Sequence, residues 1–213
     1  MNTVNSFKNN KRIILASASP RRRELLSLVT DKFEVLTADV DERAAEIRIE
    51  EEGVPALRVS EHLAEIKAQA VFDSLTDEEK KNSIVIGADT SVILDNIIFG
   101  KPADREEAVR MLSLLSGHTH TVATGVSIFE GGNKKSFTEE TLVEFNELDD
   151  YQKKLISDYI DTGSPFDKAG GYGIQDMGAL LVKRIDGDYA NVVGFPVSRL
   201  ARELSNMLKY PLE

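Results

Sequence analysis

The sequence predicts an α/β domain, and three observations support this prediction. Short apolar runs of the kind found in buried strands alternate along the chain with longer stretches whose apolar residues recur at helical spacing. The length of 213 residues suits one α/β domain or two small lobes, with enough chain for a substantial core. Apolar residues make up 41% of the chain and charged residues 29%, which is typical of a folded globular protein.

The charge and composition exclude several classes of protein. A formal net charge of -10 argues against a general binder of nucleic-acid polymers or anionic membranes, because both need a basic surface. The absence of cysteine excludes disulfides, thiolate zinc sites and a cysteine nucleophile, and it suits a reducing compartment. No apolar run approaches the length of a transmembrane helix or of the apolar part of a secretory signal, and we expect a polar, disordered tail at residues 1–11.

The first predicted helix contains an electrostatic conflict. A short strand at residues 13–15 leads through small residues to a helix that begins at Pro20, with Ser19 as its N-cap. Residues 21–23 are all arginine, although the first turn of a helix already carries a positive dipole and unpaired amide donors. A bound anion such as phosphate would resolve this conflict. Taken alone, however, the helix favours the simpler interpretation that the arginines point to solvent and pair with surface acids.

A long helix in the first half of the chain carries a lysine on its apolar side. Residues 33–36 are predicted as a strand, residues 38–52 as an acid-rich, exposed segment that is irregular or weakly helical, and residues 55–72 as the helix. Lys67 falls on the apolar stripe of that helix. Either the ammonium reaches solvent from the edge of the stripe or it points inward into a cleft, and the spacing fits both equally.

An acid interrupts the next strand. After a polar loop at residues 76–82, residues 84–94 form a nearly continuous apolar run, the pattern of a strand buried on both faces. Asp89 lies inside this run, and a buried carboxylate needs a hydrogen-bond network, a cation or a metal as its partner. Backbone donors could satisfy it, but charged residues at strand ends in α/β folds often line the ligand crevice, which favours a site.

A hairpin follows this strand. Residues 95–96 form a turn that leads to a return strand at 97–99, and the next helix is predicted within 104–117. Lys101 lies just before this helix. It is either a solvated loop lysine or a second cation that faces Asp89 across the hairpin.

Two histidines open the following pair of strands. His118 and His120 lie two residues apart where a strand begins, so they share one face of it. They could start a metal site, but because no third ligand motif lies nearby we expect a solvent-facing pair. Residues 121–129 and 136–145 alternate in polarity as two strands joined by a glycine-rich turn.

The last third of the chain contains a second glycine-rich stretch. A helix is predicted within 149–163, and residues 167–175 then contain three glycines in four positions. This indicates unusual backbone angles or close approach to a ligand, with a flexible surface loop as the alternative. Neither GxGxxG nor P-loop spacing occurs in the chain. Residues 179–185 and 189–193 are predicted as paired strands, and a last helix begins at Pro196.

Five short segments carry a resemblance to a known family. They are Ser17-Ala18-Ser19-Pro20-Arg21-Arg22, Glu65-Ile66-Lys67-Ala68, Gly87-Ala88-Asp89-Thr90, Gly100-Lys101-Pro102, and Lys168-Ala169-Gly170-Gly171-Tyr172-Gly173-Ile174-Gln175. Each is a weak signal alone, whereas all five at compatible spacing are specific. Together they resemble the Maf nucleoside triphosphate pyrophosphatases from residue 13 to about residue 208, so we expect residues 12–213 to form a single Maf-like domain.

The resemblance implies a fold, a reaction and a cofactor. The fold would be α/β and Maf/Ham1-like: an elongated mixed β-sheet flanked by helices, with two lobes and a central cleft. The reaction would be hydrolysis of a nucleoside triphosphate to the monophosphate and pyrophosphate, with a divalent metal cation, Mg²⁺ or Mn²⁺. The resemblance further implies a cytoplasmic enzyme that keeps the nucleotide pool clean, and a homodimer.

The resemblance also implies roles for single residues. Asp89 would be catalytic, as a general base or as a metal-bound carboxylate that activates water. Asp41 stands where relatives often carry glutamate, and it would be a metal ligand together with Asp89. The phosphate-binding positions of the family match Arg21, Arg22, Lys67 and Lys101. The expected substrate-binding residues are Ser19, Arg21, Arg22, Lys67, Thr90, Lys101 and Gln175.

The pocket residues resemble the branch of the family that acts on dTTP and UTP. That branch carries arginine after Ser-Pro, threonine after Gly-Ala-Asp and glutamine in the glycine loop, and this chain has Arg21, Thr90 and Gln175. The amide of Gln175 could pair with the polar edge of a pyrimidine. The chain departs from the family at Gly171, where alanine is usual, and at Asp176, where glycine is usual.

The residues suit this chemistry without a covalent nucleophile. Phosphoryl chemistry needs positioning and charge neutralisation, which four cations and one or two carboxylates on a hard metal provide. The chain has no cysteine and no Gly-x-Ser-x-Gly motif. Two alternatives stay open: a non-catalytic, nucleotide-binding regulator of cell division, and a pyrophosphatase for inosine or other modified nucleotides.

Overall fold

The computed structural model describes residues 11–208, apart from the side chains of Glu50 and Leu208. The predicted disordered tail therefore lies, except for Lys11, outside the described residues. The strands are β1 (Arg12–Ala16), β2 (Glu34–Val35), β3 (Ser83–Leu94), β4 (Ile97–Phe99), β5 (Thr119–Glu130), β6 (Asn133–Phe145) and β7 (Val182–Asp186). The helices are α1 (Pro20–Leu26), α2 (Glu42–Glu51), α3 (Ala56–Ser74), α4 (Asp77–Asn82), α5 (Arg105–Leu115), α6 (Asp150–Asp161), α7 (Tyr189–Val193) and α8 (Val197–Leu208). Three short 3₁₀ segments, η1 (Ser164–Asp167), η2 (Ala169–Gly171) and η3 (Met177–Leu181), follow α6.

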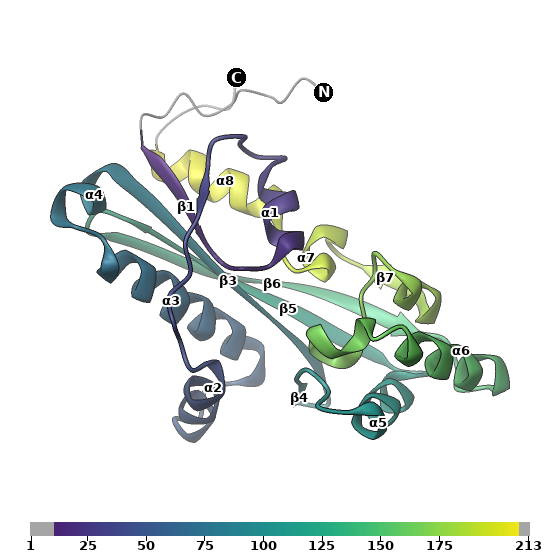
Figure 1. Cartoon of the computed structure of the whole chain (residues 1–213). Helices are drawn as coiled ribbons and strands as arrows, with labels where there is room; N and C mark the ends of the chain where they lie inside the picture. The colour runs from purple at the N-terminus through teal and green to yellow at the C-terminus, as the bar shows by residue number, and fades with distance from the viewer. Residues whose placement is uncertain (1–10, 209–213) are drawn as a thin grey trace.

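One mixed, seven-stranded sheet runs the length of the molecule, as Figure 1 shows. Its strand order is β2-β1-β3-β5-β6-β7, and β4 pairs with β3 beside this path. Strand β1 is parallel to β2 and β3, and the other pairs are antiparallel. The α/β fold class and the elongated mixed sheet flanked by helices are confirmed.

Helix α3 covers one face of the sheet. Ile14 of β1 and Val85 of β3 pack there with Ala68 and Phe72 of the helix. Successive strand residues point to opposite faces, so their sequence neighbours pack on the other side.

The opposite face holds two separate cores, which form the two predicted lobes. At one end, Leu15 and Ile86 pack with Leu26 of α1 and Leu200 of α8. At the other end, residues of β3, β5 and β6 pack against α5 and α6, including the fully buried Tyr159. Figure 1 shows α1 and α8 at one end of the long strands and α5 and α6 at the other.

The edge of β3 has a gap between its two partners. Strand β1 follows β3 only as far as the pair Ala16 and Gly87. Strand β4 begins its pairing farther along, at Val92 and Phe99. Within the described chain, residues 88–91 therefore have no strand partner on this edge, and Asp89 lies in the gap.

Helix α3 lies directly on the sheet because two glycines face it. A Cβ at Gly87 would come within 2.3 Å of the carbonyl oxygen of Ala64, and a Cβ at Gly125 within 2.3 Å of the Cα of Glu61. No other residue fits at these two positions without movement of the helix. The close approach of the helix backbone to the sheet determines which atoms of β3 the side chains of α3 can contact.

Three local predictions of secondary structure were wrong. Residues 76–82 are mostly helix α4 rather than loop, because Thr76 and Glu79 form a reciprocal capping box. Residues 189–193 are helix α7 rather than a strand: Asp188 caps its start, and Gly194, at a φ of 116°, ends it. The strand predicted to begin at residue 179 begins at Val182, after the 3₁₀ segment η3.

The two histidines do not share a face. His118 precedes β5 and is exposed, as predicted, but His120 is buried with 1% of its surface exposed. The Nε2 atom of His120 lies 2.8 Å from the hydroxyl of Tyr172. Within residues 11–208, no helix has the length and apolarity that crossing a bilayer requires.

Candidate active site

A cavity of about 1140 Å³ opens at the gap in β3. Its walls come from residues 16–22, Glu42, Lys67, residues 89–92, residues 98–101, residues 192–194 and the segment between Asp167 and Asp176. The structure brings to this cavity the predicted residues Ser19, Arg21, Arg22, Lys67, Asp89, Thr90, Lys101 and Gln175. Segments far apart in sequence therefore meet at one place.

Asp89 and Lys67 form an ion pair on the α3 side of the sheet. The Lys67 Nζ atom lies 2.7 Å from Asp89 Oδ1. Only 13% of the Lys67 side chain and 14% of the Asp89 side chain are exposed. The inward orientation of Lys67, one of the two interpretations of its spacing, is the one that the structure has.

The second acid of the site is Glu42 rather than Asp41. Glu42 opens α2, and its Oε2 atom lies 2.9 Å from Lys67 Nζ, so the lysine joins two carboxylates. Asp41 does not line the cavity; its Oδ1 accepts a hydrogen bond from the backbone N–H of Ala44 and caps the helix. The role of Asp41 as a metal ligand stays a prediction, and the structure places its side chain outside the cavity wall, whereas that of Glu42 lies in it.

The cations around Glu42 stabilise its ionised carboxylate. Burial alone would raise the pKa of Glu42, but the hydrogen bond and charge of Lys67, with the charges of Lys101 and Arg22, lower it below its ordinary value. A sequence signal for Glu42 existed. Aspartate is a strong N-cap residue, so Asp41 is the residue expected to cap the start of the helix. The carboxylate of the next residue, Glu42, is then free to face the cavity.

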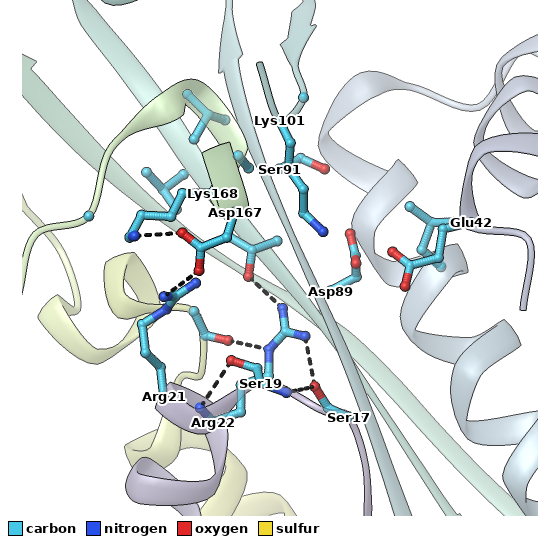
Figure 2. Close-up of a pocket in the computed structure, with 18 of the residues that line it drawn as sticks. Ser17, Ser19, Arg21, Arg22, Glu42, Asp89, Ser91, Lys101, Asp167 and Lys168 are labelled. Carbon is cyan, nitrogen blue, oxygen red and sulfur yellow. Dashed lines mark hydrogen bonds and ion pairs between the residues drawn. The ribbon is translucent and has the colours of Figure 1, made fainter. Parts of the chain in front are cut away.

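Arg22 is fixed by acceptors from three parts of the chain. Its Nε donates to the Gly194 carbonyl at 3.0 Å, its Nη1 to Ser17 Oγ at 3.2 Å and its Nη2 to Thr90 Oγ1 at 3.1 Å. Figure 2 shows the guanidinium near Ser17, below Asp89. Ser19 caps α1 as predicted, because its Oγ accepts from the Arg22 backbone N–H.

The environment of Arg22 is partly apolar and partly charged. Burial lowers the pKa of the Arg22 guanidinium from its ordinary value, whereas the charges of Asp89 and Glu42 raise it. Arginine stays protonated because its ordinary pKa is far above neutrality. The site therefore holds a permanent cation at a defined orientation.

Thr90 connects Arg22, through Thr124, to helix α7. Its hydroxyl lies 3.0 Å from Thr124 Oγ1, and Thr124 Oγ1 donates to the Asn191 carbonyl at 3.2 Å. Because the Thr124 proton is used there, the Thr90 hydroxyl donates to Thr124 and accepts from Arg22. Thr124 and Asn191, both completely buried, were not predicted as part of the site, since only the packing of β5 on α7 brings them to it.

Arg21 meets an acid that sequence reasoning did not single out. Its Nη1 lies 3.2 Å from Asp167 Oδ2, and Asp167 Oδ1 accepts from Lys168 Nζ at 2.6 Å. Burial would raise the pKa of Asp167, but hydrogen bonds from Lys168 and Arg21 lower it. Of the three arginines of α1, only Arg23 is exposed.

Lys101 and Gln175 both line the cavity. Figure 2 shows the Lys101 ammonium pointing toward Asp89. In the part of the chain that the structure describes, the side chains of Lys101 and Gln175 make no hydrogen bond. Both groups are therefore available to a bound molecule.

The acids of the cavity fit a hard divalent cation that also binds other ligands. Asp89 and Glu42 lie on either side of the Lys67 ammonium, and carboxylate oxygens are the donors that Mg²⁺ prefers. Across residues 11–208, no group of three or more His, Cys, Asp or Glu side chains is arranged to hold a metal. Two carboxylates suffice for Mg²⁺, which takes its remaining ligands from water and phosphate oxygens.

Known proteins resemble the chain over most of its length. A dTTP/UTP pyrophosphatase of Thermosipho africanus (strain TCF52B) is 48% identical over 189 residues, covering 89% of this chain and 90% of the relative. A dTTP/UTP pyrophosphatase of Geobacillus sp. (strain WCH70) is 46% identical over 197 residues, covering 92% and 98%. A solved structure, that of the Staphylococcus aureus Ham1 protein, aligns with a TM-score of 0.44 at 16% identity over 64% of this chain and 73% of its own.

The family itself follows from the sequence match. The model of the family described as Maf-like protein matches residues 12–207, which include the five segments named above and every residue of the cavity wall. The chain belongs to the Maf family.

Proposed function

We propose that this protein hydrolyses nucleoside triphosphates, with dTTP and UTP favoured, to the nucleoside monophosphate and pyrophosphate. The observation that carries this proposal is the composition of one cavity, which gathers the cations Arg21, Arg22, Lys67 and Lys101 around Asp89 and Glu42. The relatives named dTTP/UTP pyrophosphatase support the substrate class, since they match about nine tenths of the chain.

The cations would bind the triphosphate. Phosphoryl transfer depends on positioning and on neutralisation of charge. Arg22 is oriented by its three acceptors, so its guanidinium loses little freedom when an oxyanion arrives. Lys101 makes no hydrogen bond to the described side chains and backbone, so its ammonium can turn to a phosphate oxygen without breaking one.

Asp89 would act on the attacking water. Its Oδ1 accepts from Lys67, which leaves Oδ2 to accept the proton of a water aligned with the α-phosphorus. The water oxygen forms a bond to the α-phosphorus, and the bond from that phosphorus to the bridging oxygen breaks. Pyrophosphate leaves with the electron pair, and the arginines and lysines stabilise its charge.

A divalent cation, Mg²⁺ or Mn²⁺, would be held by Asp89 and Glu42. When bound, such an ion withdraws charge from phosphate oxygens and lowers the pKa of water. Glu42 takes the role first expected of Asp41 because its side chain, and not that of Asp41, reaches the cavity. The lowered pKa of Glu42 keeps it in the ionised form that metal binding requires.

Gln175 and Thr90 would face the base and sugar side of the nucleotide. An amide offers a donor and an acceptor together, which matches the adjacent carbonyl and N–H groups of uracil and thymine. A site that uses both groups disfavours a base whose donors and acceptors are reversed. A cytoplasmic location and a homodimer belong to the same proposal, and cell fractionation and light scattering test them.

The first test is a panel of nucleoside triphosphates, namely dTTP, UTP, CTP, ITP and 7-methyl-GTP, assayed with Mg²⁺ and with Mn²⁺. We expect release of pyrophosphate, with dTTP and UTP the best substrates. A non-catalytic regulator would bind nucleotides without releasing pyrophosphate, and an enzyme for modified nucleotides would favour ITP or 7-methyl-GTP.

The second test replaces Asp89 by asparagine. We expect Asp89→Asn to reduce turnover of dTTP by about 1000-fold or more, because the amide cannot take the proton of water. Circular dichroism should show the variant folded. Turnover within tenfold of the unsubstituted protein would remove Asp89 from the chemistry.

A further inference from the structure

Asp176, adjacent to the proposed base-reading residue, is the acceptor of a compact polar network. Its Oδ2 accepts a hydrogen bond from Ser164 Oγ at 2.5 Å and lies 3.5 Å from Lys168 Nζ. Its Oδ1 accepts from the backbone N–H of Gly178 at 2.8 Å and so caps η3. One carboxylate therefore joins the beginning of this segment, at residue 164, to its end, at residue 178.

Lys168 is the cation at the centre of this network. Its Nζ donates to the carbonyl oxygen of Ser164 at 2.6 Å, to Ser164 Oγ at 2.9 Å and to Asp167 Oδ1 at 2.6 Å. Only 11% of the Lys168 side chain is exposed. A Cβ at Gly173 would lie 2.5 Å from Lys168 Cε, so the glycine provides the space that the lysine side chain fills.

The network links the two ends of the proposed substrate site. It begins at Arg21, which pairs with Asp167, and it passes through Lys168 to Asp176. Gln175 is the next residue along the chain, and its side chain itself makes no hydrogen bond to the described residues. The position of Gln175 is thus set by its neighbours in the chain, and Asp176 ties the segment at this point to Ser164, Lys168 and Gly178.

The carboxylate of Asp176 is ionised at neutral pH. Burial would raise the pKa of Asp176, but hydrogen bonds from Ser164 and from the Gly178 N–H, with the charge of Lys168, lower it below its ordinary value. An ionised acceptor makes stronger hydrogen bonds than a neutral one.

We propose that Asp176 is a positioning residue that holds the Gln175 amide where a pyrimidine base binds, by fixing Ser164, Lys168 and the start of η3. This inference rests on the proposed function and adds a determinant of substrate selectivity to it. When the carboxylate is removed, Lys168 has Asp167 as its remaining carboxylate partner, and the backbone that follows Gln175 loses its cap. The base-binding wall then loses its fixed position, while Asp89, Lys67 and Glu42 keep their contacts with one another.

The test compares Asp176→Ala with the matched control Asp149→Ala. Asp149 also caps a helix, accepting from the Gln152 N–H at 2.8 Å, but it lies outside the cavity wall. For Asp176→Ala we expect KM for dTTP and UTP to rise about tenfold while kcat changes by less than about twofold. The preference for UTP over CTP, measured as the ratio of kcat/KM values, should fall about fivefold. Asp149→Ala should lower the midpoint of thermal unfolding by about as much as Asp176→Ala does. It should leave the KM for dTTP and UTP and the preference for UTP over CTP unchanged.

Two further variants test the cause. Asp176→Asn keeps an acceptor for the Gly178 N–H but removes the charge beside Lys168, and we expect a rise in KM of about threefold. In Ser164→Glu combined with Asp176→Ala, the longer side chain extends beyond the position of Ser164 Oγ toward the place that Asp176 Oδ2 vacates, 2.5 Å away. This double variant should recover most of the lost KM and selectivity.

The outcomes separate this inference from the proposed function. Suppose that the unsubstituted protein hydrolyses dTTP and UTP, and that Asp176→Ala and Asp149→Ala have the same KM and the same preference for UTP as the unsubstituted protein. The positioning role of Asp176 is then wrong, and the proposed function stands. If the folded double variant stays as impaired as Asp176→Ala, the carboxylate is not what positions Gln175. If the unsubstituted protein neither hydrolyses nor binds dTTP and UTP in calorimetry, both proposals are overturned.

Discussion

Two adjacent acids, Asp41 and Glu42, divide the work at the start of α2. The aspartate accepts a hydrogen bond from the Ala44 N–H in the first turn of the helix, whereas the glutamate extends into the cavity toward Lys67. The difference arises from their positions: Asp41 precedes the helix and uses its carboxylate to cap it, whereas Glu42 is the first helical residue and its longer side chain reaches Lys67. The division of roles is testable because each acid has an uncharged amide analogue of the same size.

The substitutions Glu42→Gln and Asp41→Asn form a matched pair. We expect Glu42→Gln to lower kcat/KM for dTTP by about 100-fold, because it removes one charge from the proposed metal site. Asp41→Asn should stay within about twofold of the unsubstituted protein, since asparagine caps a helix as well as aspartate does. Steady-state kinetics over a range of Mg²⁺ concentrations measures both. A larger loss of kcat/KM in Asp41→Asn than in Glu42→Gln would show that Asp41, and not Glu42, serves the proposed metal site.

At the residue scale, the sequence singles out side chains that break a local rule. The arginines in the first turn of α1 and the acid inside an apolar strand both conflict with their surroundings, and the structure places Arg21, Arg22 and Asp89 on one cavity. Asp167 and Thr124 break no local rule. Their contacts with Arg21 and Thr90 depend on how distant segments pack, which no short stretch of sequence records.

At the scale of elements, the contact between α3 and the sheet sets the distance from Lys67 to Asp89. The backbone of the helix lies against Gly87 and Gly125, where a Cβ would come within 2.3 Å of helix atoms. The ion pair of 2.7 Å is made by a lysine on this helix and an aspartate on β3. Any enlargement at these glycines must therefore move Lys67 away from Asp89.

Gly125→Ala tests this dependence, with Gly132→Ala as its control. The added methyl group at Gly125 meets the backbone of Glu61, and we expect a loss of about 3 kcal/mol in the free energy of unfolding. The same change at Gly132, in the turn between β5 and β6, has nothing within 4 Å of the new Cβ and should change stability by less than about 0.5 kcal/mol. Urea denaturation measures both values. Activity of Gly125→Ala, assayed where it is folded, should fall as well, because Lys67 is displaced.

Element prediction was most successful where periodicity was long. The strand at residues 84–94 and the helix at residues 55–72 have clear patterns, and the structure confirms both to within a few residues. Residues 189–193 failed because their β-branched residues favour a strand, while the caps at Asp188 and Gly194 favour a helix, and the caps prevailed. In a short element, the few apolar residues give a weaker signal than the capping residues at its two ends.

At the scale of the whole molecule, the site exists because β3 is longer than either partner on one edge. Strand β1 ends opposite Gly87 and β4 begins opposite Val92, and the cavity opens between them. The two cores on the opposite face lie on either side of the same interval. A nucleotide bound there would contact both lobes, and neither lobe alone carries the complete set of cations. Sequence patterns revealed the strands but not this register, because pairing partners come from distant segments.

Global stability should depend on pH through His120, a buried residue of β5 whose ring contacts Phe145 and Tyr172. Burial lowers the pKa of His120 from 6.5 to about 4, and it raises the pKa of Tyr172, which therefore stays neutral. Above pH 6.5 this histidine is neutral in the folded and the unfolded chain alike. Below pH 6.5 the unfolded chain takes up a proton that the folded protein does not, so stability falls until the pH reaches about 4.

The contribution of His120 can be isolated by comparing pH dependences. Between pH 7.5 and pH 5 it should amount to about 2 kcal/mol of the free energy of unfolding. We expect His120→Gln to remove this part of the pH dependence while leaving the contribution of the surface acids. His62→Gln is the matched control, because His62 is exposed on α3 and its removal should leave the dependence unchanged. Denaturant unfolding at pH 7.5, 6.5, 5.5 and 5 supplies the curves, and parallel curves for His120→Gln and the unsubstituted protein would show that His120 takes up a proton equally well in both states.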